Sequence, residues 1–167
     1  MLRRLAPWIL AVALLAGVGY GYSRSRDDGD AGTTARVVRA VDGDTIVVDV
    51  DGRQERVRYI GVDTPESVKP GARVQCFGNY ASRFNHMLVD GRHVRLVTDA
   101  EERDRYGRLL AYVYRADDGM FVNAELVRDG YARPLTIKPN GRFADDFQAL
   151  AAEARHARRG LWKRCSR

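Results

Sequence analysis

Alternating apolar and polar positions in the first half of the chain predict three short strands. These are expected at 36–41, 45–50 and 55–61, where β-branched residues are frequent. Asp42-Gly43-Asp44 and Asp51-Gly52 separate them, and both sequences are typical of tight turns. Closely spaced strands joined by short turns favour a meander that coils into a small barrel.

The second half of the chain changes to helical spacing. Apolar residues three or four apart predict helices at 79–89, 123–128 and 143–159, and two further strands are expected at 93–98 and 109–114. This element order predicts an α+β domain that is mainly β. The apolar positions that give the first helix its spacing are Tyr80, Phe84, Met87 and Leu88.

The N-terminus carries a different pattern. Two arginines precede residues 5–22, which contain no charge and are followed by a polar stretch. Positive charge before an apolar run of about 20 residues is typical of a secretory signal or a membrane anchor. The length of the run favours an uncleaved anchor helix that contacts the membrane. We therefore expect a leader or anchor at 1–22, a linker at 23–34 and an extracytoplasmic domain at 35–165, secreted or periplasmic if the leader is cleaved.

The folded part is basic, and its positive charge is almost entirely arginine. The formal net charge is +6, and lysine occurs only at positions 69, 138 and 163. Arginine binds phosphate with a planar fork, so this composition suits a polyanion partner such as nucleic acid. A solvated surface in which arginine replaces lysine explains the same composition equally well.

Polar residues with phosphate and metal chemistry lie at the end of the third predicted strand. Arg58 lies within the strand, and Asp63, Thr64 and Glu66 follow it, with Pro65 restricting the backbone between them. Hard oxygen donors suit Ca²⁺ or Mg²⁺, and an arginine can hold a phosphate through two parallel hydrogen bonds. Taken alone, this stretch is better explained as a strand followed by a polar turn.

Three separated segments together resemble the staphylococcal nuclease (thermonuclease-like) family. They are Asp42-Gly43-Asp44-Thr45, the stretch from Arg58 to Glu66, and Asp104-Arg105-Tyr106-Gly107-Arg108. The similarity extends over residues 36–163, which is nearly the whole domain. It implies a five-stranded OB-fold barrel with three helices, and hydrolysis of DNA and RNA phosphodiester bonds that leaves 3′-phosphate ends.

The resemblance also implies roles for individual residues around one bound Ca²⁺. One carboxylate is expected to act as the general base, and two arginines are expected to hold the scissile phosphate. The implied metal ligands are Asp44, Asp63 and the backbone carbonyl of Thr64, the catalytic residues are Arg58, Glu66 and Arg108, and the expected substrate contacts are Arg105, Tyr106 and Lys138.

One segment departs from the family pattern. A pair of tyrosines that stacks on the bound nucleotide is replaced by Leu135-Thr136-Ile137. Such stacking contributes about 1–3 kcal/mol per base, so we expect weaker binding of single nucleotides. Arg133 and Lys138 are expected to recover part of this affinity through backbone phosphates.

Cys76 and Cys165 are the only cysteines. An even count in an exported chain favours one disulfide, which would join the loop before the first helix to the C-terminal tail. The alternative is two free thiols that take no part in catalysis.

The combined pattern favours an exported or membrane-anchored, monomeric, Ca²⁺-dependent nuclease with little sequence preference. The alternative is a non-catalytic OB-fold domain that binds nucleic acid at the cell surface, because barrels of this kind also bind strands without chemistry. A pure binding domain has no need of Asp44, Asp63, Glu66, Arg58 and Arg108 together, which favours the enzyme.

Overall fold

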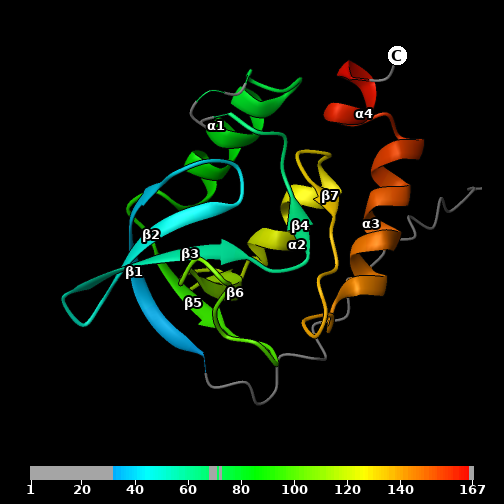
Figure 1. Cartoon of the computed structure of the whole chain (residues 1–167). Helices are drawn as coiled ribbons and strands as arrows, with labels where there is room; N and C mark the ends of the chain where they lie inside the picture. Colours follow the sequence, from blue (N-terminus) through cyan, green and yellow to red (C-terminus); the bar gives the residue numbers. More distant parts are fainter. Residues whose placement is uncertain (1–31, 68–70, 72, 166–167) are drawn as a thin grey trace, which may run out of the picture.

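A closed barrel of five strands forms the centre of the computed structural model, which describes residues 32–67, 71 and 73–165 (Figure 1). Around the barrel the order is β1-β2-β3-β6-β5, and β5 returns to pair with β1. Only the β3–β6 pair is parallel among these neighbours. The barrel strands are β1 (Thr33–Ala40), β2 (Thr45–Val50), β3 (Arg53–Tyr59), β5 (His93–Val97) and β6 (Leu109–Arg115). The predicted α+β barrel is therefore confirmed.

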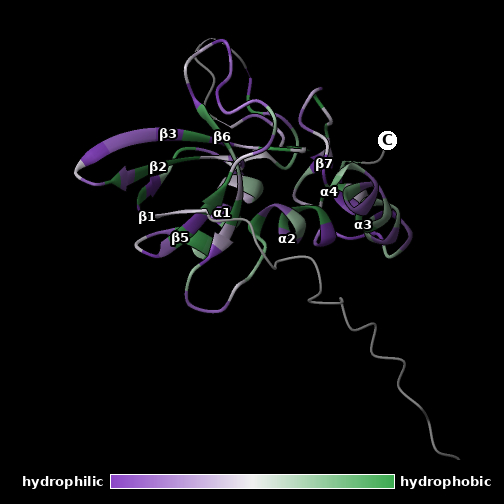
Figure 2. Cartoon of the chain, turned by 90° about the horizontal axis from the view of Figure 1, so that it is seen from below, coloured by the Kyte–Doolittle hydropathy of each residue, from purple (hydrophilic) through white to green (hydrophobic). Residues whose placement is uncertain are grey.

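Helices pack on the end and one side of this barrel. They are α1 (Gly78–Val89), α2 (Val122–Arg128), α3 (Ala144–His156) and the short α4 (Leu161–Arg164). Both views place α2 between the barrel strands and α3 (Figures 1 and 2). A two-stranded ribbon of β4 (Val62–Asp63) and β7 (Arg133–Pro134) lies in the same middle layer.

One continuous core joins the barrel interior to the helices. Its members come from alternate positions of the strands and from the inner faces of α2 and α3, as period-2 and period-3.6 patterns require. Burying an aliphatic or aromatic side chain of this size contributes about 1.5–3 kcal/mol. Among the core residues are Val37, Ile46, Val48, Val57, Leu96, Val113, Leu126, Phe147 and Leu150.

The first and third strands and the last long helix have ends that differ from the predicted ones for identifiable reasons. The first strand begins at Thr33, inside the predicted linker, because Thr33 and Thr34 pair with β5. The third strand ends at Tyr59, because Gly61 adopts a φ of 79° and turns the chain into β4. The last long helix ends at His156 rather than at 159, because Arg158 adopts a positive φ, and α4 follows it.

Helix α1 buries only part of the face that its apolar residues predict, because Phe84 and Leu88 pack on the core but Tyr80 and Met87 do not. Tyr80 and Met87 are 53% and 68% exposed, whereas Ala81, Asn85 and Leu88 are buried. The buried side of α1 is the side that contacts the barrel, and it includes the polar residue Asn85. The spacing of apolar residues therefore predicts that the segment is a helix, but it does not fully predict which side of the helix faces the barrel.

Asn85 connects α1 to the start of the candidate site. Its side-chain oxygen accepts a hydrogen bond from the Tyr59 hydroxyl at 2.9 Å, and its amide nitrogen donates to the Asp42 carbonyl at 2.9 Å. Because the side chain is fully buried, its polar atoms need these partners. The hydrogen bond to the Asp42 carbonyl therefore holds this turn against α1.

No helix in the described part of the chain is both long enough and apolar enough to cross a membrane. The predicted leader or anchor at 1–22 lies outside the described residues, as does most of the predicted linker.

Replacing the buried Asn123 by leucine should destabilise the fold. Its side-chain oxygen accepts the Val113 N–H at 2.9 Å, and its amide donates to the Ile60 carbonyl at 2.9 Å. Asn123→Leu leaves these buried backbone groups without partners, so we expect a loss of about 2–4 kcal/mol in the free energy of unfolding. The matched control is Asn79→Leu at an exposed position of α1. Urea unfolding of both variants measures the effect, and equal midpoints would contradict this account.

Candidate active site

The turn between β1 and β2 holds Asp44 in a nearly buried position, with 5% of the residue exposed. One carboxylate oxygen accepts the Thr64 backbone N–H at 2.7 Å and the Thr64 hydroxyl at 2.8 Å. The other oxygen accepts the Thr45 hydroxyl at 3.3 Å. These bonds tie the first turn to the segment that follows β4, twenty positions later in the sequence.

Gly43 permits the close approach of these two segments. A Cβ atom at position 43 would lie 2.5 Å from the Thr64 hydroxyl oxygen, which is far inside van der Waals contact. Any side chain at this position would therefore push Thr64 away from Asp44. The Asp-Gly-Asp sequence is thus required for contact as well as for the turn.

Arg58 lies between two carboxylates that come from separate turns. Its Nη1 is 2.9 Å from Asp44 Oδ1, and its Nη2 is 3.0 Å from Asp63 Oδ1. Nη1 also donates to the Val62 carbonyl at 3.0 Å. The contacts with Val62 and Asp63 are hydrogen bonds, and the contact with Asp44 is an ion pair. The structure therefore brings Asp44 and Asp63 together around one guanidinium.

Asp42 adds a third carboxyl group to this region. Burial raises the pKa of Asp42 to about 6, and the adjacent Asp44 carboxylate adds to that rise. Asp42 accepts the Asp44 backbone N–H at 3.0 Å, which orients the turn. The sequence analysis assigned this residue to the turn alone. The site carries more acidic than basic groups, a balance that a divalent cation would offset.

The oxygen donors here fit a calcium ion. Asp44 and Asp63 supply carboxylate oxygens, Thr64 supplies a carbonyl, and the Asp63 side chain is 53% exposed and therefore accessible. Hard oxygen ligands of this kind suit Ca²⁺ or Mg²⁺. Within the described ranges, no group of three or more His, Cys, Asp or Glu residues is placed to hold a metal. Water and substrate oxygens would have to complete the coordination.

Glu66 follows Pro65 at the end of this segment, and its backbone is held on both sides. Its N–H donates to the side-chain oxygen of Gln75 at 3.0 Å, and its carbonyl accepts the Gln75 backbone N–H at 2.9 Å. One carboxylate oxygen accepts the Ser67 N–H at 3.0 Å. The sequence analysis did not single out Gln75, because a lone glutamine in a loop carries no pattern.

The loop before β6 presents the predicted phosphate and substrate residues. Arg108 Nε donates to Asp104 Oδ2 at 2.7 Å. The guanidinium carbons of Arg105 and Arg108 lie 4.8 and 5.5 Å from the centre of the Tyr106 ring, and Tyr106 is 68% exposed. An exposed aromatic ring between two arginines is a surface that suits a nucleotide.

Arg108 lies directly before β6, whose Leu110 pairs with Arg58 in the parallel β3–β6 ladder. The two arginines are therefore carried by neighbouring segments of the barrel. Among the described residues, the ion pair of Arg108 is with Asp104 and not with Asp44 or Asp63.

Asn140 ties the segment that carries Lys138 to the loop before β6. Its buried amide accepts the Glu101 N–H at 2.7 Å and donates to the Glu101 carbonyl at 2.8 Å. Lys138 itself is exposed. Leu135 and Ile137, which replace the expected tyrosines, are 40% and 66% exposed. An aliphatic surface therefore stands where the family pattern has stacking rings.

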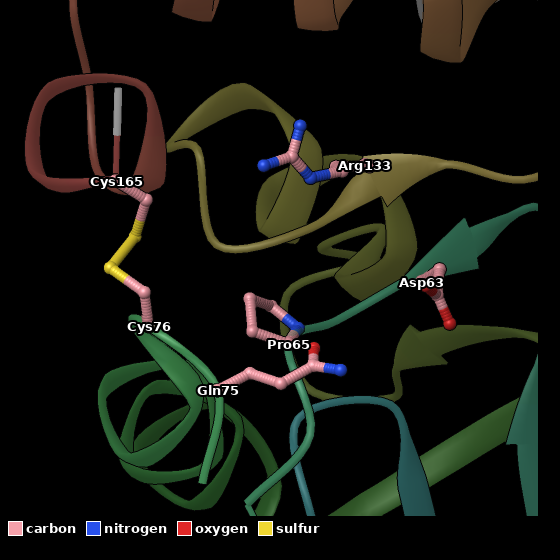
Figure 3. A pocket seen from close by; sticks show the side chains of 6 residues that line it. All are labelled: Asp63, Pro65, Gln75, Cys76, Arg133 and Cys165. Carbon is pink, nitrogen blue, oxygen red and sulfur yellow. A yellow bond between two sulfur atoms is a disulfide. The ribbon is translucent and has the colours of Figure 1, made fainter. Parts of the chain in front are cut away.

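A depression of about 290 Å³ adjoins Asp63 on the side of α4 (Figure 3). The disulfide between Cys76 and Cys165 closes one side of it, and Arg133 lies above it. Arg133 is also the partner of Asp63 in the β4–β7 ladder. The lining residues are Asp63, Pro65, Gln75, Cys76, Arg133 and Cys165.

Comparison with known proteins agrees with this architecture. The family model described as Staphylococcal nuclease homologue matches residues 56–164. Thermonuclease of Staphylococcus hyicus is 43% identical over 129 residues, which cover 77% of this chain and 75% of that protein. Thermonuclease of Staphylococcus intermedius is 40% identical over 161 residues, covering 93% and 95%. Endonuclease YncB of Bacillus subtilis is 42% identical over 128 residues, covering 75% and 60%.

The family match covers the end of β3, the strands β5 and β6 and the helices that pack on the barrel, and two of these relatives are matched over three quarters or more of their own length. The chain belongs to the staphylococcal nuclease family. It is accordingly a hydrolytic nuclease, and the predicted family is confirmed.

Proposed function

We propose that this protein is a Ca²⁺-dependent nuclease that hydrolyses DNA and RNA with little sequence preference and leaves 3′-phosphate ends. The observation that carries the proposal is the convergence of Asp44 and Asp63 on Arg58. Membership of a family whose relatives are named thermonuclease and endonuclease supports it.

Asp44, Asp63 and the carbonyl of Thr64 would hold the Ca²⁺. When bound, the ion supplies charge neutralisation at the phosphate oxygens. Burial raises the pKa of Asp42 and the adjacent Asp44 carboxylate adds to the rise, and a divalent cation at this position would offset the repulsion between the two carboxyl groups. Two hydrogen bonds from Thr64 to the Asp44 carboxylate keep this carboxylate and the segment that carries the Thr64 carbonyl together. Two further hydrogen bonds join Asp44 to Asp42 and Thr45 within its own turn.

Arg58 and Arg108 would hold the scissile phosphate. Val62 and Asp63 each accept one hydrogen bond from Arg58, and a guanidinium carries five N–H groups, so donors remain for a phosphate. Arg108 is steadied through its Nε by Asp104, which leaves its terminal nitrogens to donate. Two guanidinium groups stabilise charge that develops on the phosphate oxygens and fix the ester for in-line attack.

Glu66 would act as the general base. In the proposed step its carboxylate accepts a proton from water while the water oxygen forms a bond to phosphorus. The bond from phosphorus to the 5′-oxygen then breaks, that oxygen takes a proton from solvent and leaves as a 5′-hydroxyl, and the phosphate stays on the 3′ side. The hydrogen bonds that hold the Glu66 backbone on both sides support this role, because a base must be placed within hydrogen-bond reach of its proton.

Substrate binding would rely on phosphates more than on bases. Arg105 and Tyr106 offer an exposed cationic and aromatic surface, and Lys138 adds a further charge. Leu135 and Ile137 provide apolar contact without ring stacking. Because phosphate contacts carry little sequence information, this surface supports a sequence-tolerant enzyme that prefers longer strands to single nucleotides.

We further propose that the domain acts as a monomer outside the cytoplasm, anchored by or released from its leader. The charge-free run at 5–22 supports export. The Cys76–Cys165 disulfide suits an oxidising compartment.

Mixing the purified protein with heat-denatured DNA should shorten the DNA only when Ca²⁺ is present. A gel compares Ca²⁺ with a chelator, and a second lane set repeats the test with RNA. A 3′-phosphate is checked by whether a phosphatase must precede polymerase extension of the products. Binding of DNA without any metal-dependent shortening would favour the non-catalytic alternative.

Arg58→Lys should keep the positive charge but lose the bidentate fork. We expect turnover to fall by about 10²–10³-fold, as when a preorganised donor to a transition state is removed. The matched control is Arg56→Lys, at an exposed position of the same strand. Steady-state hydrolysis of a fluorescent oligonucleotide measures both variants, and near wild-type turnover of Arg58→Lys would rule out the clamp.

A further inference from the structure

We infer that Gln75 is a positioning residue for Glu66 and that the Cys76–Cys165 disulfide holds Gln75 in place. The inference rests on the proposed role of Glu66 as the general base. It concerns a contact that none of the ion pairs of Arg58 involves. Figure 3 shows Gln75, Cys76 and Cys165 along one side of the depression that adjoins Asp63.

Gln75 binds both backbone groups of Glu66. Its side-chain oxygen accepts the Glu66 N–H at 3.0 Å, and its own N–H donates to the Glu66 carbonyl at 2.9 Å. The two residues lie nine positions apart. A paired contact of this kind fixes the rotation of the Glu66 peptide units and, with it, the direction in which the carboxylate leaves the chain.

The first residue of α1 packs against the contact between Gln75 and Glu66. The Gly78 N–H donates to the Gln75 carbonyl at 2.9 Å. A Cβ atom on Gly78 would overlap the Glu66 carbonyl oxygen, so the helix begins directly against the Glu66 backbone. The backbone of Glu66 is therefore enclosed between Gln75 and the first residue of α1.

The disulfide connects this arrangement to a second fixed element. Cys76 follows Gln75 directly and is bonded to Cys165, 89 positions later, with their Cα atoms 5.9 Å apart. Cys165 ends the short helix α4. Because Gln75 is exposed and lies in a loop, a covalent tie to its neighbour restricts where it moves.

Helix α4 has its own attachments to the domain. The Trp162 ring is flanked by Arg133 and Arg155, whose guanidinium carbons lie 4.6 and 4.5 Å from it. The Leu161 N–H donates to the Gly130 carbonyl at 2.8 Å. The disulfide thus links Gln75 to an element that is docked on the far side of the site.

A substitution at Gln75 should lower turnover without weakening metal or substrate binding. Asp44, Asp63 and Arg58 are held by contacts with Thr64 and with each other, none of which involves Gln75. Metal affinity and KM should therefore survive a change at Gln75. Misplacing a reacting group by about 1 Å costs up to about 10²-fold in rate, so kcat should fall.

Gln75→Met and Gln75→Glu form the discriminating pair of variants. Both keep the length of the side chain, but only Gln75→Glu keeps an oxygen that accepts the Glu66 N–H. We expect Gln75→Met to lower kcat by about ten-fold or more with KM and Ca²⁺ affinity unchanged, and Gln75→Glu to keep most of the wild-type kcat. The control is Gln148→Met at an exposed position of α3. Kinetics are measured well below the melting temperature of every variant.

The Cys76→Ser/Cys165→Ser double variant tests the tether. It should lower kcat in the same direction, and adding Gln75→Met should cost less than the product of the two separate effects, because both act on Glu66. Thiol titration of the unreduced, denatured wild type should find no reactive thiol. Two reactive thiols, or independent effects in the triple variant, would overturn the tether.

The outcomes separate this inference from the proposed function. A wild type without Ca²⁺-dependent turnover would overturn the proposed function and the inference with it. An active wild type with an unchanged kcat in Gln75→Met would overturn the inference alone, as would equal losses in the methionine and glutamate variants.

Discussion

The pairing of Arg58 with Asp44 and Asp63 is the interaction on which the rest of the site depends. Asp44 is almost fully buried, and a buried carboxylate is tolerated only when charge and hydrogen bonds compensate it. Arg58 supplies the charge and Thr64 supplies two donors. Two acidic turns that would otherwise repel each other are thereby held at the end of β3, where we propose that a cation and a phosphate bind together.

Support for this site comes from elements outside it. Asn85 fixes the Asp42 turn from α1, Gln75 fixes the Glu66 backbone, and Asn140 fixes the segment beside Lys138 to the loop before β6. Each is an amide side chain that bonds backbone groups of a distant loop. Functional loops gain precision when a rigid scaffold positions them, and here that scaffold is the barrel together with α1. The disulfide adds a covalent link between the residue that follows Gln75 and the C-terminal end of α4.

Much of this architecture follows from local sequence signals. The strand that begins at Thr45 and the turn at Asp51-Gly52 are where apolar alternation and turn chemistry predict them. The sequence predicted that Asp44, Arg58 and Asp63 belong to one site, because the segments that carry them together resemble one family. Asn85 and Gln75 were not predictable, since each acts through a long-range hydrogen bond that leaves no periodic trace. The buried face of α1 was predicted only in part, because Ala81 and Asn85, which lack a large apolar side chain, also meet the barrel.

Calcium binding tests the central claim most directly. Isothermal titration calorimetry would compare the wild type with Asp63→Asn, because Asp63 is half exposed and its substitution leaves no buried charge unpaired. Asp51→Asn, in the exposed β2–β3 turn, is the matched control. The account predicts one Ca²⁺ per chain, with affinity weakened by about ten-fold or more in Asp63→Asn and unchanged in Asp51→Asn. A wild type that binds no Ca²⁺, or an Asp63→Asn variant that binds it equally well, would contradict the convergence of these carboxylates on a metal ion.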